Sequence, residues 1–261
     1  MSDGTKRARG SGYIDINCDL GEGMPNDADV MPFITSASVA CGGHAGDATT
    51  MRATVAAALA ANVAIGAHPS FFDREGFGRR AQPLAPAEIA DLVLYQVGAL
   101  AFIAKRCGAR LQHVKLHGAL YHRAADDSEV ADAVAAVIER IQRDLIVVGP
   151  PASALAAASA RHGLRFAGEI FVDRAYGEDL RLVPRSDPGA MVVGGAAALA
   201  ARAVDMVTQG RVVTKNGAPR ALTGETICLH GDEAEVVARA HAVRTALTGA
   251  GVTLAPLCRF V

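Results

Sequence analysis

The sequence has no tryptophan and no excess of either charge over its 261 residues. Its 26 Lys and Arg against 27 Asp and Glu exclude an electrostatic case for binding nucleic acid or an anionic membrane. No apolar run is long enough to span a bilayer, because Arg, Asp or Glu interrupts the alanine-rich stretches. Residues 1–12 carry charge but no hydrophobic core, which predicts a disordered tail rather than a signal peptide.

The cysteines are also sparse, and their number and spacing are informative. There are five, an odd number, and no two form a Cys-x-x-Cys pair, which argues against a disulfide framework and a cysteine zinc site. A cytoplasmic protein is therefore expected. The sequence also lacks a GxxxxGK[ST] phosphate loop, a GxSxG elbow and a strand-to-helix GxGxxG. Autonomous ATP binding of the phosphate-loop kind is not supported.

What the sequence does contain is a repeated unit, in which a short apolar strand ends in glycine and a polar side chain before a helix. The unit is clearest at 38–47 (SVACGGHAGD) and returns at 63–69, 113–118 and 226–232, and in altered form at 14–22. Strands that alternate with helices predict a parallel sheet with right-handed crossovers. Seven such units predict one α/β barrel domain over 13–261, with seven or eight strands left open and a doubly wound sheet as the alternative.

The carboxyl ends of the predicted strands carry most of the residues that could do chemistry. Barrel enzymes place their active sites on that face, and four of the eight histidines fall at strand ends. Histidines clustered with carboxylates are typical of acid–base or metal chemistry. We therefore expect one mouth ringed by Asp19, Glu22, His44, Asp47, His68, Lys115, His117, Glu169, Asp173, Arg174, His230 and Asp232. Taken singly, each has a plainer explanation; Asp47 and Asp232, for example, are suited to cap helices.

Lys115 and His117 are two residues apart in a predicted strand, so both side chains point to the same side. They would offer a cation beside an acid–base group, and an internal ion pair of Lys115 with Asp19 or Glu169 is the structural alternative. A divalent metal held by Asp19, His44 and His68, or with His117, is left open, because three such ligands leave positions for water.

Two long irregular segments, 69–83 and 173–190, hold several arginines. Loops of this length in a compact domain are usually functional or mobile. Arg74, Arg79, Arg80 and Arg185 could bind a carboxylate or phosphate through paired N–H donors, although exposed loop arginines are often merely solvated.

Taken together, the motifs resemble those of the LamB/YcsF family over nearly the whole chain after residue 12. The matching stretches are DINCDLGEG at 15–23, SVACGGHAGD at 38–47, VAIGAHPS at 63–70, KLHGALY at 115–121, FVDRAY at 171–176, LVPR at 182–185 and CLHGD at 228–232. The resemblance implies a distorted (β/α)7 TIM-like barrel of the polysaccharide-deacetylase type. It also implies one subunit of an ATP-dependent 5-oxoprolinase, which opens 5-oxo-L-proline to L-glutamate together with two partner subunits that bind most of the ATP.

The hypothesis from the sequence therefore assigns two groups of residues. The catalytic group is Asp19, Glu22, His44, His68, Lys115 and His117, with His44 or His117 as the base. The substrate-binding group is Asp47, Arg74, Arg79, Glu169, Asp173, Arg174 and His230. The alternatives are a stand-alone metal-dependent deacetylase or amide hydrolase, and a non-catalytic ligand-binding subunit. The sequence also leaves a homo-oligomer open.

Overall fold

The computed structural model describes residues 12–231 and 235–261. The expected disordered tail, apart from Gly12, and the expected cap at Asp232 lie outside the described residues.

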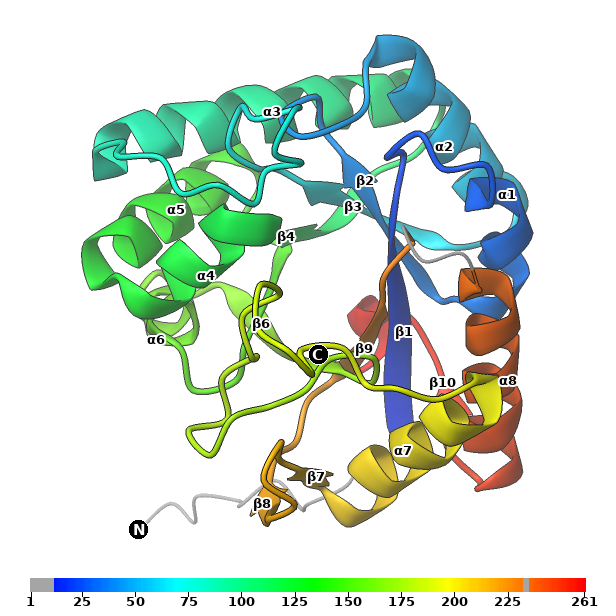
Figure 1. Cartoon of the computed structure of the whole chain (residues 1–261). Helices are drawn as coiled ribbons and strands as arrows, with labels where there is room; N and C mark the ends of the chain where they lie inside the picture. Colours follow the sequence, from blue (N-terminus) through cyan, green and yellow to red (C-terminus); the bar gives the residue numbers. More distant parts are fainter. Residues whose placement is uncertain (1–11, 232–234) are drawn as a thin grey trace, which may run out of the picture.

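A closed ring of seven parallel strands forms the centre of the molecule (Figure 1). Each strand pairs with the next, and β1 also pairs with β9, where Asp15 lies opposite Thr226. This closure confirms the α/β barrel, sets the strand number at seven and rules out the open sheet. The ring consists of β1 (Tyr13–Leu20), β2 (Ser36–Ala40), β3 (Ala64–His68), β4 (Leu111–Lys115), β5 (Ile146–Gly149), β6 (Arg165–Phe171) and β9 (Thr226–Leu229).

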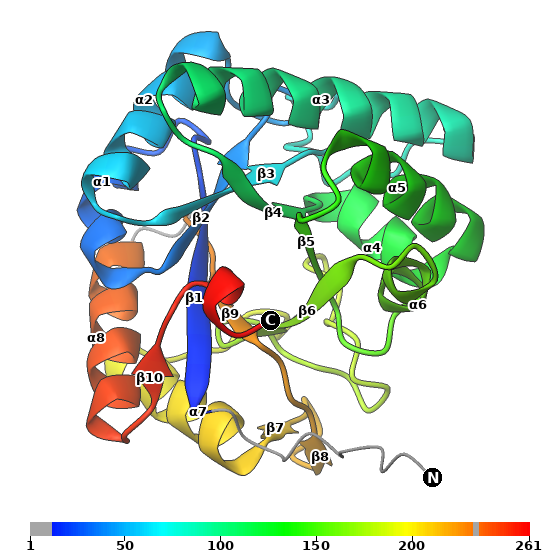
Figure 2. The ribbon, with the colours of Figure 1, turned by 180° about the vertical axis from the view of Figure 1, so that it is seen from behind.

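Helices surround the ring on the outside (Figures 1 and 2). They are α1 (Asp27–Val30), α2 (Ala48–Ala60), α3 (Pro86–Arg106), α4 (Gly118–Asp126), α5 (Ser128–Ile141), α6 (Ala154–Arg161), α7 (Ala196–Gln209) and α8 (Val236–Gly249), with the 3-10 turns η1 (Met31–Phe33) and η2 (Leu257–Arg259). The sequence pattern did not predict α4. Nor did it predict a hairpin of β7 (Arg211–Val213) and β8 (Pro219–Ala221), or β10 (Thr253–Leu254), which extends the sheet beside the start of β1.

The sequence predicted no apolar run long enough to span a bilayer, but the helix α3 meets that criterion. By length and composition alone, this 21-residue helix could cross a bilayer, because its charges are confined to its two ends. In the structure it lies in the outer layer of the barrel, where Ile89, Val93, Val97 and Leu100 are fully buried. A core helix of this kind passes the same test, so α3 is weak evidence for a membrane span.

The lumen of the barrel is polar, because alternate residues of β1 point inward. Asn17 donates to Glu169 across the lumen at 3.0 Å and to Thr226 at 2.8 Å. Asp15 accepts hydrogen bonds from the hydroxyls of Ser36 and Thr226. Burial raises the pKa of Asp15 to about 6, although these hydrogen bonds act to lower it. Polar groups in such a lumen are tolerated because each has partners.

The C-terminal segment covers the end of the barrel at which the strands begin. Leu257 of η2 packs with Ile146, Val148 and Ala167 in a separate apolar cluster, and the ring of Phe260 stacks on Tyr13 at 5.8 Å between centroids. Figure 2 shows η2 and the C-terminus in front of the ring when the barrel is viewed from this side. Access to the lumen is therefore from the opposite end, where the strands have their carboxyl ends.

Gly66 in β3 makes room for a buried ring, which gives a test of this packing. A Cβ atom at Gly66 would lie 2.1–2.3 Å from three ring atoms of His113, so Gly66→Ala is expected to destabilise the fold by about 1–3 kcal/mol through overpacking. The control is Gly98→Ala in α3, where an added Cβ meets nothing within 4 Å and stability should rise by up to about 1 kcal/mol. Chemical denaturation measures both; equal stability of the two variants would contradict the packing.

Candidate active site

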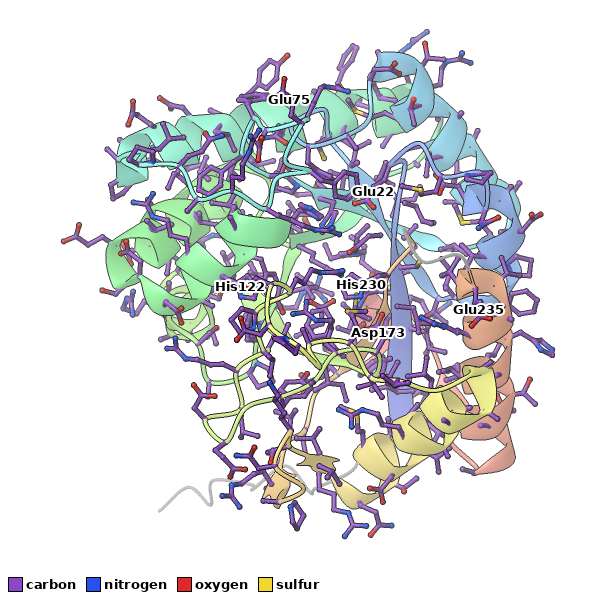
Figure 3. All side chains as sticks on the ribbon, in the orientation of Figure 1. Glu22, Glu75, His122, Asp173, His230 and Glu235 are labelled. Atoms are coloured by element: carbon purple, nitrogen blue, oxygen red, sulfur yellow. The ribbon has the colours of Figure 1, made fainter. Side chains whose placement is uncertain are left out.

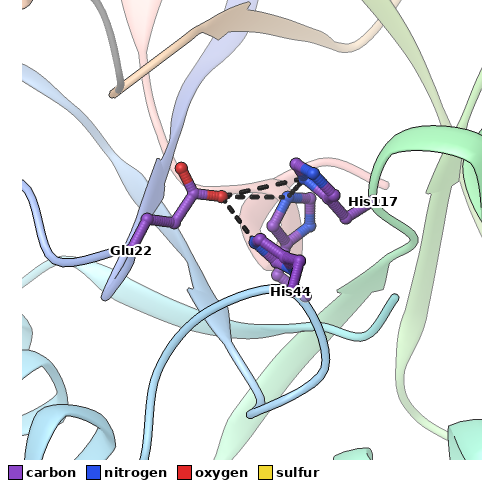
Figure 4. Close-up of side chains that lie close together, drawn as sticks. Glu22, His44 and His117 are labelled. Atoms are coloured by element: carbon purple, nitrogen blue, oxygen red, sulfur yellow. Dashed lines mark hydrogen bonds and ion pairs between the residues drawn. The ribbon is translucent and has the colours of Figure 1, made fainter. Parts of the chain in front are cut away.

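Three imidazoles and a carboxylate meet at the open end of the barrel, although they come from four separate segments. His44 follows β2, His68 ends β3, His117 precedes α4, and Glu22 follows β1. The side chain of Glu22 lies 2.7 Å from Nε2 of His44 and 3.7 Å from Nδ1 of His117 (Figure 4). The rings of His44 and His117 stack 3.7 Å apart. Their convergence confirms that strand-end histidines share one site.

Backbone and hydroxyl groups hold each of these rings from behind. Nδ1 of His68 lies 2.8 Å from the carbonyl oxygen of Lys115, and Nε2 of His117 lies 2.9 Å from that of Phe77. Nδ1 of His44 lies 2.9 Å from Oγ of Ser70. Both Phe77 and Ser70 belong to the long segment after β3, which explains why that segment is long and rich in glycine.

Gly78 brings that segment onto the rings. It has φ +65°, and a Cβ there would lie 2.9 Å from Cβ of His44 and 3.0 Å from Cδ2 of His117. Its carbonyl oxygen also accepts a hydrogen bond from the backbone N–H of Ala119 in α4. A side chain at this position would push the loop away from both histidines.

Burial and mutual repulsion keep two of the rings neutral. The pKa of His44 falls to about 3, chiefly because of burial and then because of the nearby His68. The pKa of His117 falls well below its ordinary value for the same two reasons, with His44 as a further cause. Neutral imidazoles are able to accept a proton or bind a metal.

Lys115 lies beneath this cluster and is surrounded by acceptors. Its Nζ is 2.7 Å from Asp19, 2.8 Å from Glu169 and 2.9 Å from Oδ1 of Asn17. Burial alone would lower the pKa of Lys115, but the facing carboxylate of Asp19 and the groups around it raise that pKa well above its ordinary value. The pKa of Asp19 is lowered in turn by His68 and Lys115, against the effect of burial. The internal ion pair expected as the structural alternative is therefore present.

A second acid–base pair lies on the other side of the mouth. Nδ1 of His230 is 2.7 Å from Oδ2 of Asp173, and the ring of His230 stacks on Phe171 at 5.6 Å between centroids. Burial raises the pKa of Asp173, but His230 lowers it further, so the carboxylate is ionised near neutral pH. Figure 3 shows Asp173, His230 and His122 gathered at the centre of the open end, whereas Glu75 and Glu235 lie at the periphery.

A cavity of about 380 Å³ opens between these groups. Acid–base groups of Asp19, His68, Lys115, His117 and His230 line it. Its basic lining includes Arg79, His122, Arg174 and Arg185. Such a lining suits a small anionic ligand, because positive charge and acid–base groups border the same space.

Arg174 is the most buried residue of this basic lining, with 3% of its surface exposed. One of its terminal nitrogens donates to the carbonyl oxygen of Val183 at 2.6 Å. Among the described residues, its Nε has no hydrogen-bond partner. Burial, and then the nearby Arg185, lowers the pKa of Arg174 from its ordinary value. A buried guanidinium with an unsatisfied donor favours an anion beside it.

The structure separates the remaining candidates. Asp47 is exposed and caps α2 by accepting from the N–H of Thr50 at 2.8 Å, as the plainer explanation predicted. Arg74 is exposed and donates to the carbonyl oxygens of Gly42 and Gly46. Neither lines the cavity. Arg79 does line it, with its guanidinium 4.9 Å from the ring centroid of Phe77, whereas Glu169 lies below it, paired with Lys115.

Several residues of the site were not predicted from the sequence. Ser70 and Phe77 orient histidines, and Tyr121 and His122 line the cavity. Recognition of α4 would have found Tyr121, because residues four apart on a helix share a face and Tyr121 is four residues after His117.

The ligand set expected for a metal was Asp19, His44 and His68, or these with His117. In the structure, ligand atoms of Glu22, His44, His68 and His117 lie within 4.8 Å of one another, and those of Asp19, Cys228 and His230 form a second such group. Oδ2 of Asp19 also lies 3.4 Å from Nε2 of His68.

Comparison with known proteins agrees with the motifs. Residues 14–261 match the LamB/YcsF family. A 5-oxoprolinase subunit of Bordetella pertussis is 48% identical over 246 residues, covering 92% of this chain and 97% of that protein. The corresponding 5-oxoprolinase subunit of Brevibacillus brevis is 44% identical over 247 residues, covering 93% and 97%.

A solved structure is also similar. The lactam utilization protein from Thermus thermophilus has a TM-score of 0.86 and 38% sequence identity, covering 93% of this chain and 99% of that chain. The match in motifs, sequence and fold extends over almost the whole barrel. The chain therefore belongs to the LamB/YcsF family.

Proposed function

We propose that this chain is one subunit of a 5-oxoprolinase, which opens the lactam of 5-oxo-L-proline to L-glutamate with ATP hydrolysis and two partner subunits. The observation that carries the proposal is a cavity lined by the buried guanidinium of Arg174 and by His230, which pairs with Asp173. The names of the relatives and of the similar structure support it.

The basic residues of the cavity are assigned to recognition of the substrate. 5-Oxoproline is a small ring that carries one carboxylate and one amide. In the proposal its carboxylate binds the guanidinium of Arg174, which lines the cavity. Arg185 also lines the cavity and adds positive charge. With the carboxylate held there, the ring and its carbonyl carbon extend toward His230 and the histidine cluster.

The acid–base step is assigned to His230 with Asp173. A carboxylate only accepts, so Nδ1–H of His230 donates to Asp173 and Nε2 keeps its lone pair. His230 removes a proton from water as the water oxygen bonds to the lactam carbon, and the same proton then goes to the nitrogen as the C–N bond breaks. His44 and His117, the bases favoured from the sequence, have their rings fixed by other partners.

ATP is assigned to the partner subunits. A lactam is a stabilised amide, and phosphorylation of its oxygen would make the carbon more electrophilic. Addition of one water and cleavage of the C–N bond then leave an acyl phosphate, which a second water hydrolyses to L-glutamate and inorganic phosphate. Because the sequence has no phosphate-loop motif, we infer that the partners carry out that activation and that this chain receives the activated ring. A cytoplasmic location belongs to the same proposal, since all five cysteines are free.

Reconstitution tests the function. Purified chain, the two partner subunits, ATP and 5-oxoproline are expected to release L-glutamate and ADP together. Omission of any one protein should abolish glutamate release. Glutamate formed at the full rate without this chain would refute the proposal.

A substitution in the same assay tests the binding of the carboxylate. Arg174→Gln should raise KM about 10–100-fold, because a hydrogen bond to a charged group contributes about 1.5–3 kcal/mol. The matched control is Arg181→Gln, since Arg181 is exposed and pairs with Asp126 outside the cavity. An unchanged KM for Arg174→Gln would place the carboxylate elsewhere.

The second candidate is a metal-dependent amide hydrolase that acts without ATP. The observation that favours it is the convergence of Glu22 with three histidines. It predicts hydrolysis of amide or acetamido substrates by the isolated chain when a divalent metal is present. The reconstitution separates the two, because only the 5-oxoprolinase requires ATP and the partners.

A further inference from the structure

We propose that Glu22, His68 and His117 bind one divalent transition-metal cation of the Zn²⁺ class, with His44 holding the carboxylate of Glu22. Metal binding at this site does not require the proposed reaction, because it depends on which ring nitrogens of the histidines carry hydrogen. These four side chains are each at most 8% exposed, and their ligand atoms lie within 4.8 Å of one another.

Two of the rings have their tautomers fixed by backbone carbonyls. A carbonyl oxygen can only accept, so Nδ1 of His68 carries a hydrogen toward Lys115 and Nε2 of His117 carries one toward Phe77. The other nitrogen of each neutral ring therefore has a lone pair. Those two nitrogens, Nε2 of His68 and Nδ1 of His117, face each other at 3.0 Å. Two facing lone pairs repel unless a cation or proton lies between them.

The third ring holds the carboxylate instead. A carboxylate only accepts, so Nε2–H of His44 donates to Glu22 at 2.7 Å. The rings of His44 and His117 are also nearly parallel, 3.7 Å apart with an angle of 4° between their planes, so their in-plane nitrogen lone pairs do not meet. Two nitrogen lone pairs, from His68 and His117, and the carboxylate of Glu22 therefore face one another.

The spacing suits a metal of about the size of zinc. Tetrahedral ligands at about 2.0–2.1 Å from Zn²⁺ are about 3.3 Å apart. The separations of the three ligand atoms straddle that value: 3.0 Å between His68 and His117, and 3.7 and 4.0 Å from Glu22 to His117 and His68. Imidazole with one carboxylate is a donor set that Zn²⁺ and its neighbours favour over Mg²⁺ or Ca²⁺.

The surroundings also match those of metal-binding histidines, which usually donate their second N–H to a carbonyl or similar acceptor. His68 and His117 both do so here. His68 and His117 also line the cavity, so a cation held here borders the space assigned to substrate. When bound, it would polarise an oxygen placed beside it.

Metal uptake by the whole chain tests the site without any substrate. The chain is stripped with a chelator and titrated separately with Zn²⁺, Co²⁺ and Mn²⁺, with stoichiometry and affinity measured by calorimetry and elemental analysis. One equivalent of Zn²⁺ and of Co²⁺ is expected. Glu22→Gln should weaken affinity by more than about 100-fold, because it removes a ligand rather than an outer partner. The control, His122→Gln, removes an imidazole from the same cavity and should leave affinity unchanged.

A measurement on the unaltered chain covers the case in which Glu22→Gln fails to fold. In ¹⁵N-histidine NMR, Zn²⁺ should shift Nε2 of His68 and Nδ1 of His117, and leave His122 and His241 unshifted. No uptake by the native chain, unchanged affinity in a folded Glu22→Gln variant, or shifts confined to other histidines would each overturn the proposal. Failure of 5-oxoprolinase activity would not affect these readouts.

Discussion

Replacement of Lys115 by methionine is expected to lower the free energy of unfolding by about 3–5 kcal/mol, because it leaves buried carboxylates without their cation. Lys115 is 2% exposed and is paired with Asp19 at 2.7 Å and Glu169 at 2.8 Å. For a protein of this size the change corresponds to a fall in Tm of roughly 6–20 °C. Thermal and urea unfolding monitored by circular dichroism would measure it.

Two further variants separate the charge effect from loss of the side chain itself. Adding Glu169→Gln to Lys115→Met removes one of the uncompensated carboxylates, so the double variant should be more stable than Lys115→Met alone. Lys105→Met is the matched control, because Lys105 is exposed on α3 and its loss should change stability by less than about 0.5 kcal/mol. If Lys115→Met and Lys105→Met unfold at the same temperature, the buried ion pair does not stabilise the barrel.

Loss of the His230–Asp173 pair should have the largest effect on catalysis. His230→Gln is expected to reduce kcat of the reconstituted enzyme by about 100–10,000-fold, because it removes the group that transfers the proton. Asp173→Asn should also reduce kcat, since an amide in place of the carboxylate no longer fixes the tautomer of His230. KM for 5-oxoproline should change little in either variant, because Arg174 holds the carboxylate.

The double variant shows whether the two residues act as a unit. If they do, His230→Gln with Asp173→Asn should lose little more activity than His230→Gln alone. His241→Gln serves as the control, because the ring of His241 packs against Phe33 and does not line the cavity. Additive losses in the double variant, or near-normal kcat in His230→Gln, would indicate that a histidine of the cluster is the base instead.

The barrel could be predicted from the sequence because its strands end in a repeated pattern. Alternating strands and helices imply parallel pairing, and parallel pairing brings all strand ends to one face. That reasoning placed His44, His68 and His117 together, although 73 residues separate the first from the last in the sequence. It also predicted that Lys115 and His117 share a side.

The details that depend on side-chain partners could not be predicted in this way. An aspartate just before a helix can cap the helix or bind a substrate, and the sequence is the same in both cases. Only the contact of Asp47 with Thr50 in the structure shows that it is a cap. The start of α4 carries no capping Ser, Thr, Asp or Asn, since His117 precedes Gly118. The tautomers of the histidines depend on carbonyl oxygens of distant segments, which no local pattern encodes.

Closure of the ring also has a consequence for how the chain is made. Asp15 in β1 bonds to Thr226 in β9, 211 residues later. At about 5–20 residues per second, the ribosome needs roughly 10–40 s to supply that partner. Throughout this interval one edge of β1 is open to pairing with other nascent chains. The yield of folded protein in a cell should therefore depend on chaperones that bind nascent chains, and not only on the stability of the finished barrel.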